Sequence, residues 1–327
     1  MNTRAVLLLV ILALTTVASL LLSLDSGSLN ISWPEIVGSF SAEQKTMAQQ
    51  LVQELRLPRA LGAFITGGLL ALAGALMQVL LRNPLADPYV LGISGGAAVA
   101  ALLAILSGLS GLALSGSAFI GALCSMLLVF GLSHGKGSWT PTRLLLTGIV
   151  LAAGWGAVIS FLLVISPDQN LRSMLFWLMG DLGYAQTTTT GFIVLITGLL
   201  ISLSFARSLN ILSHGELQAT SLGVQTDRLR LLVYILASLM TATAVTLAGS
   251  IGFVGLVVPH LIRLLGFSDN RILLPAATLM GGSLLILADT LSRTIIAPEQ
   301  LPVGVISAAI GVPMFLFLLY RGQVQRL

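Results

Sequence analysis

Apolar stretches of about 20 residues recur along the whole chain, and this repetition constrains the fold more than any other feature. A helix of that length crosses the hydrocarbon core of a bilayer. Charged residues make up only 9% of the 327 residues, whereas a soluble protein has about 25%. With a mean hydropathy of +1.00, the chain has too few charges to cover a water-facing surface. The sequence therefore predicts an all-α, polytopic membrane protein.

About ten transmembrane helices are predicted, in a single domain that covers residues 1–327. They span approximately residues 5–24, 57–81, 90–108, 112–132, 143–165, 189–206, 231–249, 252–266, 272–291 and 301–320. The eighth is short, with Gly252 and Gly255 at its start and Pro259 inside it. A further apolar piece, LRSMLFWLMGDLGYA, is too short to span and is predicted to lie on the outer surface or to dip back into the membrane.

The basic residues indicate the orientation of these spans. Ten spans place both termini on one side, and that side carries 11 of the 16 basic residues but only four of the 12 acids. Cytoplasmic loops of membrane proteins carry an excess of lysine and arginine. Both termini are therefore predicted to be cytoplasmic. The same residues are scattered among loops and form no patch, so nucleic acid is not a predicted partner.

The stretch RNPLADPYVLGISGGAAVA begins at Arg82 and turns the chain at the predicted cytoplasmic face. Pro84 and Pro88 prevent a continuous helix and hold the preceding residues extended. Non-helical backbone at membrane depth is tolerated only where protein buries it or water reaches it. Two interpretations remain open from this pattern alone, an ordinary hairpin and the mouth of a pore.

Signatures of catalysis and of metal binding are missing from the sequence. The nearest approach to a phosphate-binding loop, GLSHGKGS, has the wrong spacing and no Ser or Thr after the lysine. His134, His214 and His260 are each isolated, so no metal site, cofactor or catalytic residue is predicted. The single cysteine, Cys124, excludes a disulfide framework within one chain.

Acidic residues do not line the predicted helices as a proton or sodium relay would require. Asp289 is the nearest to an intramembrane acid, and Arg293 follows one helical turn later, where it can form an ion pair. A secondary transporter or channel working alone is thus the alternative function, and transport driven by a partner protein is favoured.

Seven segments of the chain, in order, resemble the FecCD-type permease subunits of bacterial ATP-binding cassette (ABC) importers, and the cobalamin permeases of that family are similar in length and spacing. The segments are RLPRALGAFITGGLLALAGALMQ, NPLADPYVLGISGGAA, RLLLTGI, HGELQATSLGV, GSIGFVGLVVPHLIRLLG, LADTLSR and LPVGVISAAIGVPMFLFLL. The resemblance covers essentially the whole chain.

The resemblance implies a type II ABC importer permease fold in the bacterial cytoplasmic (inner) membrane. It implies a homodimer with a translocation path along the two-fold axis, two cytoplasmic ATPase subunits below it, and an extracytoplasmic solute-binding protein above it. ATP hydrolysis would belong to the ATPase subunits, so the chain itself is not expected to be an enzyme. The solutes of the family are iron–siderophore chelates, haem and cobalamin.

The longest polar stretch on the predicted cytoplasmic side covers residues 207–230. Its pattern predicts a short surface helix that ends at Gly223, a natural helix stop. A solvated connector is the simpler interpretation. The resemblance instead implies a coupling segment that inserts a short helix into a groove on the ATPase. The residues assigned to coupling are Glu216, Leu217, Ala219, Leu222 and Gly223.

Arginine is unusual on a translocated face, where Arg56, Arg59 and Arg293 are predicted to lie. The planar guanidinium suits carboxylates on a partner. The alternatives are snorkelling or an intramolecular pair, such as Arg56 with Glu54 or Arg293 with Asp289. In the family, arginines at the matching places engage glutamates of the binding protein, so docking is the favoured hypothesis.

Four residues match the cytoplasmic constriction of the family. They are Asn83 and Leu85 in the proline-bounded stretch and Pro141 and Thr142 in SWTPTRLLL. The second pair departs from the cobalamin permeases, in which hydroxyl residues fill both positions. Pro141 removes a hydrogen-bond donor and stiffens the turn. The small residues in GISGGAAVA allow the third helix to approach another backbone closely, which is compatible with packing or with lining the path.

Overall fold

The computed structural model describes residues 3–27, 31–39, 46–133, 140–184 and 188–324, and within these ranges it contains helices and no strand. Each predicted span coincides with a helix. These are α1 (Thr3–Asp25), α4 (Leu57–Leu80), α5 (Ile93–Leu106), α6 (Gly111–Ser133), α7 (Pro141–Ile165), α9 (Thr188–Ser204), α12 (Thr226–Ala248), α13 (Val254–Leu264), α14 (Asn270–Thr294) and α15 (Val303–Val324).

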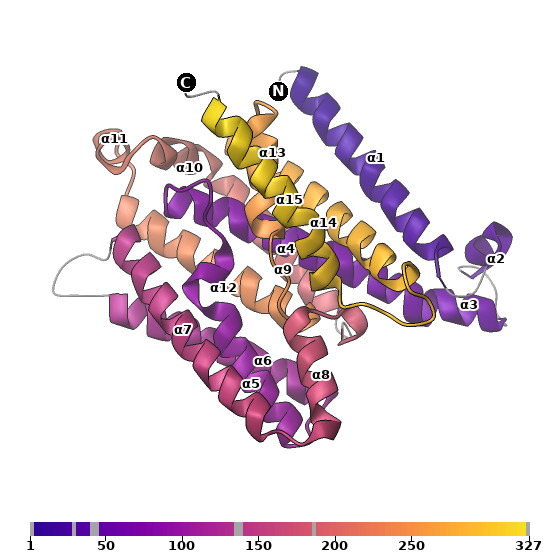
Figure 1. Cartoon of the computed structure of the whole chain (residues 1–327). Helices are drawn as coiled ribbons and strands as arrows, with labels where there is room; N and C mark the ends of the chain where they lie inside the picture. Colours follow the sequence, from indigo (N-terminus) through magenta and orange to yellow (C-terminus); the bar gives the residue numbers. More distant parts are fainter. Residues whose placement is uncertain (1–2, 28–30, 40–45, 134–139, 185–187, 325–327) are drawn as a thin grey trace.

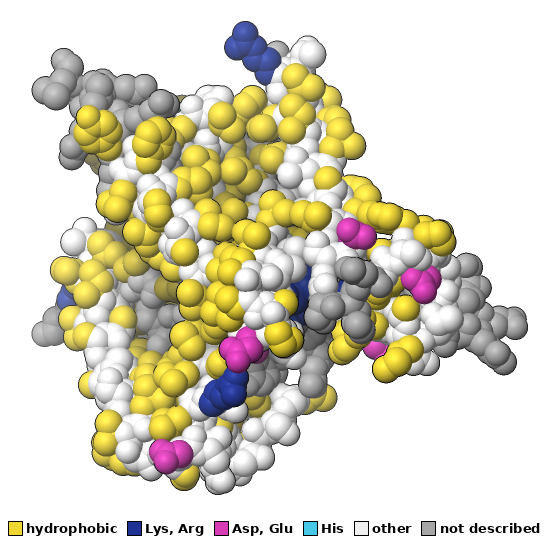
Figure 2. All heavy atoms as spheres, turned by 45° about the vertical axis from the view of Figure 1, so that its right-hand side comes forward, with side chains coloured by type: hydrophobic (Ala, Val, Ile, Leu, Met, Phe, Trp, Pro, Cys, Tyr) yellow, Lys and Arg dark blue, Asp and Glu magenta, His cyan; other side chains and the backbone are white. Residues whose placement is uncertain are grey.

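The lengths of these helices agree with a polytopic membrane protein. Among the described residues, six spans are long and apolar enough to cross a bilayer, and α9 passes the same test together with α10 (Ala206–Ser213), from which it is bent by 65°. Helices α5, α13 and the apolar part of α15 are shorter. The prediction of an all-α, polytopic membrane protein is confirmed, and the ten predicted spans agree with the positions of ten helices. Figure 2 shows a face on which hydrophobic side chains predominate and charged ones are few.

Helix α4 forms the centre of the bundle, and every residue from Ile65 to Leu80 is buried. It packs against α9, α12, α13 and α14. A helix that is hydrophobic on all sides is typically buried in this way. Its glycines permit close contact: a Cβ at Gly67 would lie 2.2 Å from the Gly281 carbonyl oxygen, and one at Gly74 would lie 1.9 Å from that of Gly255. Small residues therefore set the helix spacing at the core.

The predicted eighth span is part helix and part extended chain. Helix α13 has 11 residues, which at 1.5 Å per residue cover about half of a bilayer core. Residues 249–253 precede it without helical structure. The Tyr89 hydroxyl accepts a hydrogen bond from the Ile251 N–H at 3.1 Å, and the Ser307 hydroxyl donates to the Gly252 carbonyl at 3.4 Å. These partners satisfy backbone groups that would otherwise be costly at membrane depth.

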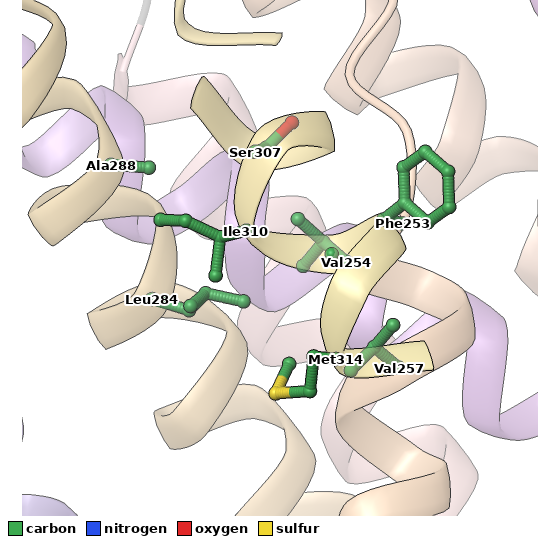
Figure 3. Close-up of a pocket in the computed structure, with 9 residues that line it drawn as sticks. Phe253, Val254, Val257, Leu284, Ala288, Ser307, Ile310 and Met314 are labelled. Carbon is green, nitrogen blue, oxygen red and sulfur yellow. The ribbon is translucent and has the colours of Figure 1, made fainter. Parts of the chain in front are cut away.

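A small apolar gap lies where α13, α14 and α15 meet. Figure 3 shows Val254 and Val257 of α13, Leu284 of α14, and Ile310 and Met314 of α15 around it. Its volume is about 10 Å³, at the lower limit of what holds one water molecule. The gap is a feature of packing and not a ligand site.

The two ends of the bundle carry different short elements (Figure 1). Both termini lie at the same end as α10 and α11 (Glu216–Ser221), and we call this the terminal face. The opposite face carries α2 (Trp33–Gly38), α3 (Met47–Leu51), the π-helical segment η1 (Val52–Arg56), α8 (Asp168–Met179) and the 3₁₀ turn η3 (Leu182–Tyr184).

The piece predicted not to span, LRSMLFWLMGDLGYA, falls mainly on α8. This helix has 12 residues and is too short to cross the membrane. Met174 and Trp177 are buried, and α8 packs against α5 and α15. After it, the Asp181 N–H donates to the carbonyl of Ala248 at the end of α12. The segment is therefore too short to span, as predicted, and it covers the end of α12 on the opposite face.

Candidate functional site

A cleft of about 680 Å³ opens on the opposite face and brings together all three arginines of the docking hypothesis. Arg56 ends η1, Arg59 lies in the first turn of α4, and Arg293 lies in the last turn of α14. Glu54 and Gln300 also line the cleft. The chain runs from η1 into α4 without a break. Pro58, which has no N–H to donate to the preceding turn, lies where the π-helical segment changes to α-helix.

The Arg56 guanidinium is directed to the end of α1 and not to the mouth of the cleft. Its Nη1 donates to the carbonyl oxygens of Leu24 at 2.7 Å and Asp25 at 3.0 Å. Carbonyls at the end of a helix lack intrahelical partners and attract a cation. Arg56 is only 5% exposed. It therefore joins the end of α1 to the start of α4 through backbone oxygens.

Arg59 and Arg293 share one buried carboxylate. The Arg59 Nε lies 3.0 Å from Oδ1 of Asp289, and the Arg293 Nε lies 3.0 Å from Oδ2. The Asp289 side chain is 0% exposed. Arg59 also donates to Oε1 of Gln300 at 2.8 Å, and Arg293 donates to the Ser23 hydroxyl at 2.9 Å. The intramolecular Arg293–Asp289 pair is thus present, and Arg59 joins it.

Two acids face the two arginines of this cluster, because Asp181 lies beside Arg59 in addition to the shared Asp289. Asp181, after α8, lies 3.8 Å from Arg59 Nη2 at the partly exposed edge of the cluster. The side chain of Arg59 is 15% exposed, the larger exposure of the two arginines that hold Asp289. Of these two guanidinium groups, that of Arg59 is therefore the better placed for a carboxylate arriving from outside.

The predicted coupling segment forms two short helices on the terminal face. Helix α11 ends at Ser221, and Gly223, the predicted helix stop, follows two residues later with a left-handed φ of +81°. Ala219 is buried, while Leu222 is exposed and Leu217 is 89% exposed. A large apolar side chain that points into water has no role in packing this chain. The two leucines therefore form an apolar pair on the surface of the terminal face.

Helix α10, which precedes α11, was not predicted and is anchored by one asparagine. The Asn210 side chain donates to Oδ1 of Asp269 at 2.7 Å and accepts from the N–H of Asn270 at 2.8 Å. Asp269 caps α14 through the Arg271 N–H. Partial desolvation raises the pKa of Asp269. The hydrogen bonds from Asn210 and the Arg271 N–H, together with the Arg271 charge, have the larger combined effect, so the pKa is lowered overall. The start of α14 thus fixes the coupling segment.

Glu216, the first residue of α11, contacts two other segments of the terminal face. Its carboxylate accepts from Arg230 on α12 at 2.6 and 2.5 Å and from Arg82, after α4, at 3.3 Å. Sequence reasoning assigned Glu216 to a partner contact and gave no role to Arg82 or Arg230. The separation of Glu216 and Arg82 by 134 positions left no local signal for their pairing.

The predicted gate residues lie on two segments, the 82–87 turn and the start of α7, and among the described residues no hydrogen bond is seen between the two pairs. Asn83 and Asp87 each accept, through Oδ1, the N–H two residues later, at 2.9 and 2.8 Å, so the 82–87 turn is held by its own side chains. The Leu85 side chain is 38% exposed. The 3₁₀ segment η2 (Pro88–Leu91) follows and packs against α7.

The second gate segment is the start of α7. Pro141 occupies the first position of the helix, and the Thr140 hydroxyl caps it by accepting from the Arg143 N–H at 3.3 Å. Thr142 is exposed and Pro141 is partly buried. The non-helical turn and the stiff helix start are both as predicted, while their action as a gate stays a prediction.

Within the ranges that the structure describes, no group of three or more His, Cys, Asp or Glu side chains is placed to hold a metal ion. His134 and most of GLSHGKGS lie outside the described residues. His260 on α13 has a buried Nδ1 without a partner among the described residues, and no acid pairs with it there.

Comparison with known proteins extends over nearly the whole chain. The FecCD transport family matches residues 13–321. The hemin transport system permease protein HmuU of Yersinia pestis is 41% identical, over 98% of this chain and 95% of its own. The cobalamin import system permease protein BtuC of Halobacterium salinarum is 39% identical, over 91% of this chain and 82% of its own.

A solved structure agrees with the fold. An inward-facing ABC transporter, described as of the metal-chelate type, superposes with a TM-score of 0.84 at 32% identity. The match covers 97% of this chain and 99% of the other.

Proposed function

This chain belongs to the FecCD transport family and is a permease subunit of an ABC importer; we propose that two copies of it, driven by two cytoplasmic ATPase subunits, import a metal-chelate solute delivered by a binding protein. The terminal face is then cytoplasmic and the opposite face receives the binding protein. The excess of basic residues on the terminal face supports this orientation.

The exposed Leu217 and Leu222 are the observation that carries the energy-coupling part of the proposal. Leu217 lies on α11 and Leu222 directly follows its last residue. The Glu216 ion pair and the buried Ala219 hold α11 on the bundle. A rigid short helix with an apolar tip fits a groove on another protein. The likeness to a solved ABC transporter, together with the lack of a phosphate-binding loop in this sequence, supports an ATPase as the partner that supplies energy.

Docking of the binding protein is assigned to the cleft on the opposite face. Arg59 and Arg293 supply positive charge there, and Arg56 fixes α1 against α4 beside them. Carboxylates on the two lobes of a binding protein are the complementary groups. Because Arg59 is held by a buried acid, its guanidinium is oriented before the partner arrives.

The second copy is proposed to bind along the apolar surface of α7. This helix is poorly covered by the rest of the chain, with exposed Ile149, Val150, Phe161 and Val164. It also begins at the predicted gate residues Pro141 and Thr142. Pairing of two copies along α7 would bring both gates to the two-fold axis.

The alternative of a stand-alone secondary transporter is weakened by the environment of Asp289. Both carboxylate oxygens of this buried acid are already occupied by arginines of the same chain, whereas a relay needs an acid that is open to the transported ion.

The solute class follows from relatives that are named for haemin and for cobalamin. These are chelates of a metal, and iron–siderophore complexes are the third solute class implied by the resemblance. The proposal is tested by purifying the tagged permease with its cognate ATPase and binding protein, and measuring binding-protein-dependent uptake of haem, cobalamin and ferric siderophores. Capture of both partners and uptake of at least one chelate are expected. Failure to capture an ATPase would refute the proposal.

A further inference from the structure

Three segments of the terminal face meet at the carboxylate of Glu216, and they are those to which coupling and gating are assigned. Glu216 begins α11, Arg230 lies on α12, and Arg82 begins the 82–87 turn. We propose that Arg82 and Arg230 are positioning residues which, through Glu216, tie the conformation of the 82–87 turn to the position of α11. This inference rests on the proposed function, because it describes how the ATPase would act on the permease.

The contact with Arg230 fixes α11 to the bundle. The Arg230 side chain is buried and donates both terminal nitrogens to Glu216. Its Nε is buried without a hydrogen-bond partner among the described residues. A buried guanidinium is stable only when its charge is compensated. Glu216 supplies that compensation, so the first residue of α11 moves together with the cytoplasmic end of α12.

The contact with Arg82 reaches the gate turn at a strained position. Arg82 has a φ of +48°, in the left-handed region. The Arg82 N–H bonds the Val79 carbonyl and the Asn83 N–H bonds the Gln78 carbonyl, which is the pattern that ends many helices with glycine in this place. An arginine here accepts backbone strain that glycine would avoid. The strain indicates that the arginine side chain has a function at this position. The function we assign to it is its ion pair with Glu216, at 3.3 Å.

These contacts connect the proposed ATPase-binding helix α11 to the predicted gate residues. Leu217, the apolar tip assigned to the ATPase, is the next residue after Glu216. Asn83 and Leu85 of the predicted gate follow Arg82 within three residues. A displacement of α11 by the ATPase moves the Glu216 carboxylate, and this changes the force on the Arg82 guanidinium at the start of the turn.

Three variants of Arg82 separate the effect of its charge from the effect of its backbone conformation. Arg82→Lys keeps the charge, Arg82→Gln removes it, and Arg82→Gly removes it while relieving the strained φ. Arg271→Gln is the matched control, because Arg271 is an exposed arginine of the same face that forms none of the ion pairs of this cluster. Each is made in a Cys124→Ser background with Leu85→Cys as a reporter of the turn.

The measurement is the rate of thiol labelling at position 85 in the purified permease–ATPase complex, with and without nucleotide, alongside transport per ATP hydrolysed. Arg82→Gln and Arg82→Gly should both reduce the nucleotide-dependent change in labelling by about fivefold, the factor that corresponds to ~1 kcal/mol for a half-exposed ion pair. Transport per ATP should fall with it. Arg82→Lys and Arg271→Gln should keep the wild-type response.

Two results would overturn the inference. One is a wild-type response in Arg82→Gln. The other is a wild-type response in Arg82→Gly beside a defect in Arg82→Gln, since relief of backbone strain alone would then explain the position. A wild-type permease that binds no ATPase refutes the proposed function itself, and this is seen before any variant is compared.

Discussion

At the scale of single residues, Asp289 is the centre of the arginine cluster in the cleft. Its carboxylate holds Arg59 and Arg293 together at the ends of two helices far apart in the sequence. A buried charge of this kind contributes little net stability while its partners are present, but removal of one member leaves the others uncompensated. Asp289 therefore keeps in place the two arginines to which docking is proposed to belong.

Replacement of Asp289 by Asn should lower the free energy of unfolding by about 3–5 kcal/mol, because the two guanidinium groups lose their shared acid. Unfolding in mixed detergent, followed by circular dichroism, measures this loss. Asp181→Asn is the control, since Asp181 is partly exposed and lies 3.8 Å from Arg59. It should cost less than about 1 kcal/mol. Equal stability of the two variants would contradict the role given to Asp289.

Replacement of Arg59 by Gln should weaken docking of the binding protein by about a hundredfold, the equivalent of ~3 kcal/mol for one member of a desolvated charge pair. Asp289 keeps its pair with Arg293 in this variant. Surface plasmon resonance at low and high salt measures the affinity, and higher salt should weaken wild-type docking because exposed charges are screened. Unchanged affinity together with a less stable permease would assign Arg59 to folding alone.

At the scale of helices, the sequence predicts most where the physical signal is local. Apolar composition located each of the ten spans, and the predicted 57–81 agrees with α4 to one residue. Helix α10 was missed because its packing on Leu209 and Leu212 and its anchor at Asn210 depend on distant partners. Likewise, the pair Asp289–Arg293 was foreseen from its spacing of four residues, whereas Arg59 is 230 positions away from the same acid.

Replacement of Leu217 by Asp should leave the stability of the permease unchanged, because this side chain is 89% exposed. It should weaken ATPase binding roughly thirtyfold, as expected for the loss of ~2 kcal/mol from one buried leucine at an interface. Co-purification at graded ATPase concentration measures the effect. Leu265→Asp, an exposed leucine on the same face beyond α13, is the control. Equal binding by both variants would remove α11 from the interface.

Replacement of Gly74 by Ala should destabilise the bundle by about 1–3 kcal/mol, because the new methyl group would overlap the Gly255 backbone of α13. Gly116→Ala in α6 is the matched control, since a Cβ there meets no atom within 4 Å. Thermal unfolding of the purified proteins distinguishes them. A Gly74→Ala protein as stable as Gly116→Ala would show that α4 and α13 do not cross at this point.

At the scale of the whole molecule, the proposed coupling and docking sites fall on opposite faces of the bundle. The buried α4 connects them, since Arg59 lies in its first turn and Arg82 directly follows its end. Sequence alone predicted the sidedness through the distribution of charge, but not which residues share a cleft. That arrangement depends on how α1, α4 and α14 come together at the opposite face.

The central claim is that ATP hydrolysis by a partner drives import through this permease. Proteoliposomes that contain the permease and its ATPase, with the binding protein and chelate outside, test it most directly. Uptake should require ATP inside the vesicles, should be lost in Leu217→Asp, and should be insensitive to collapse of proton and sodium gradients. Uptake that proceeds without ATP and stops when those gradients are collapsed would contradict the claim.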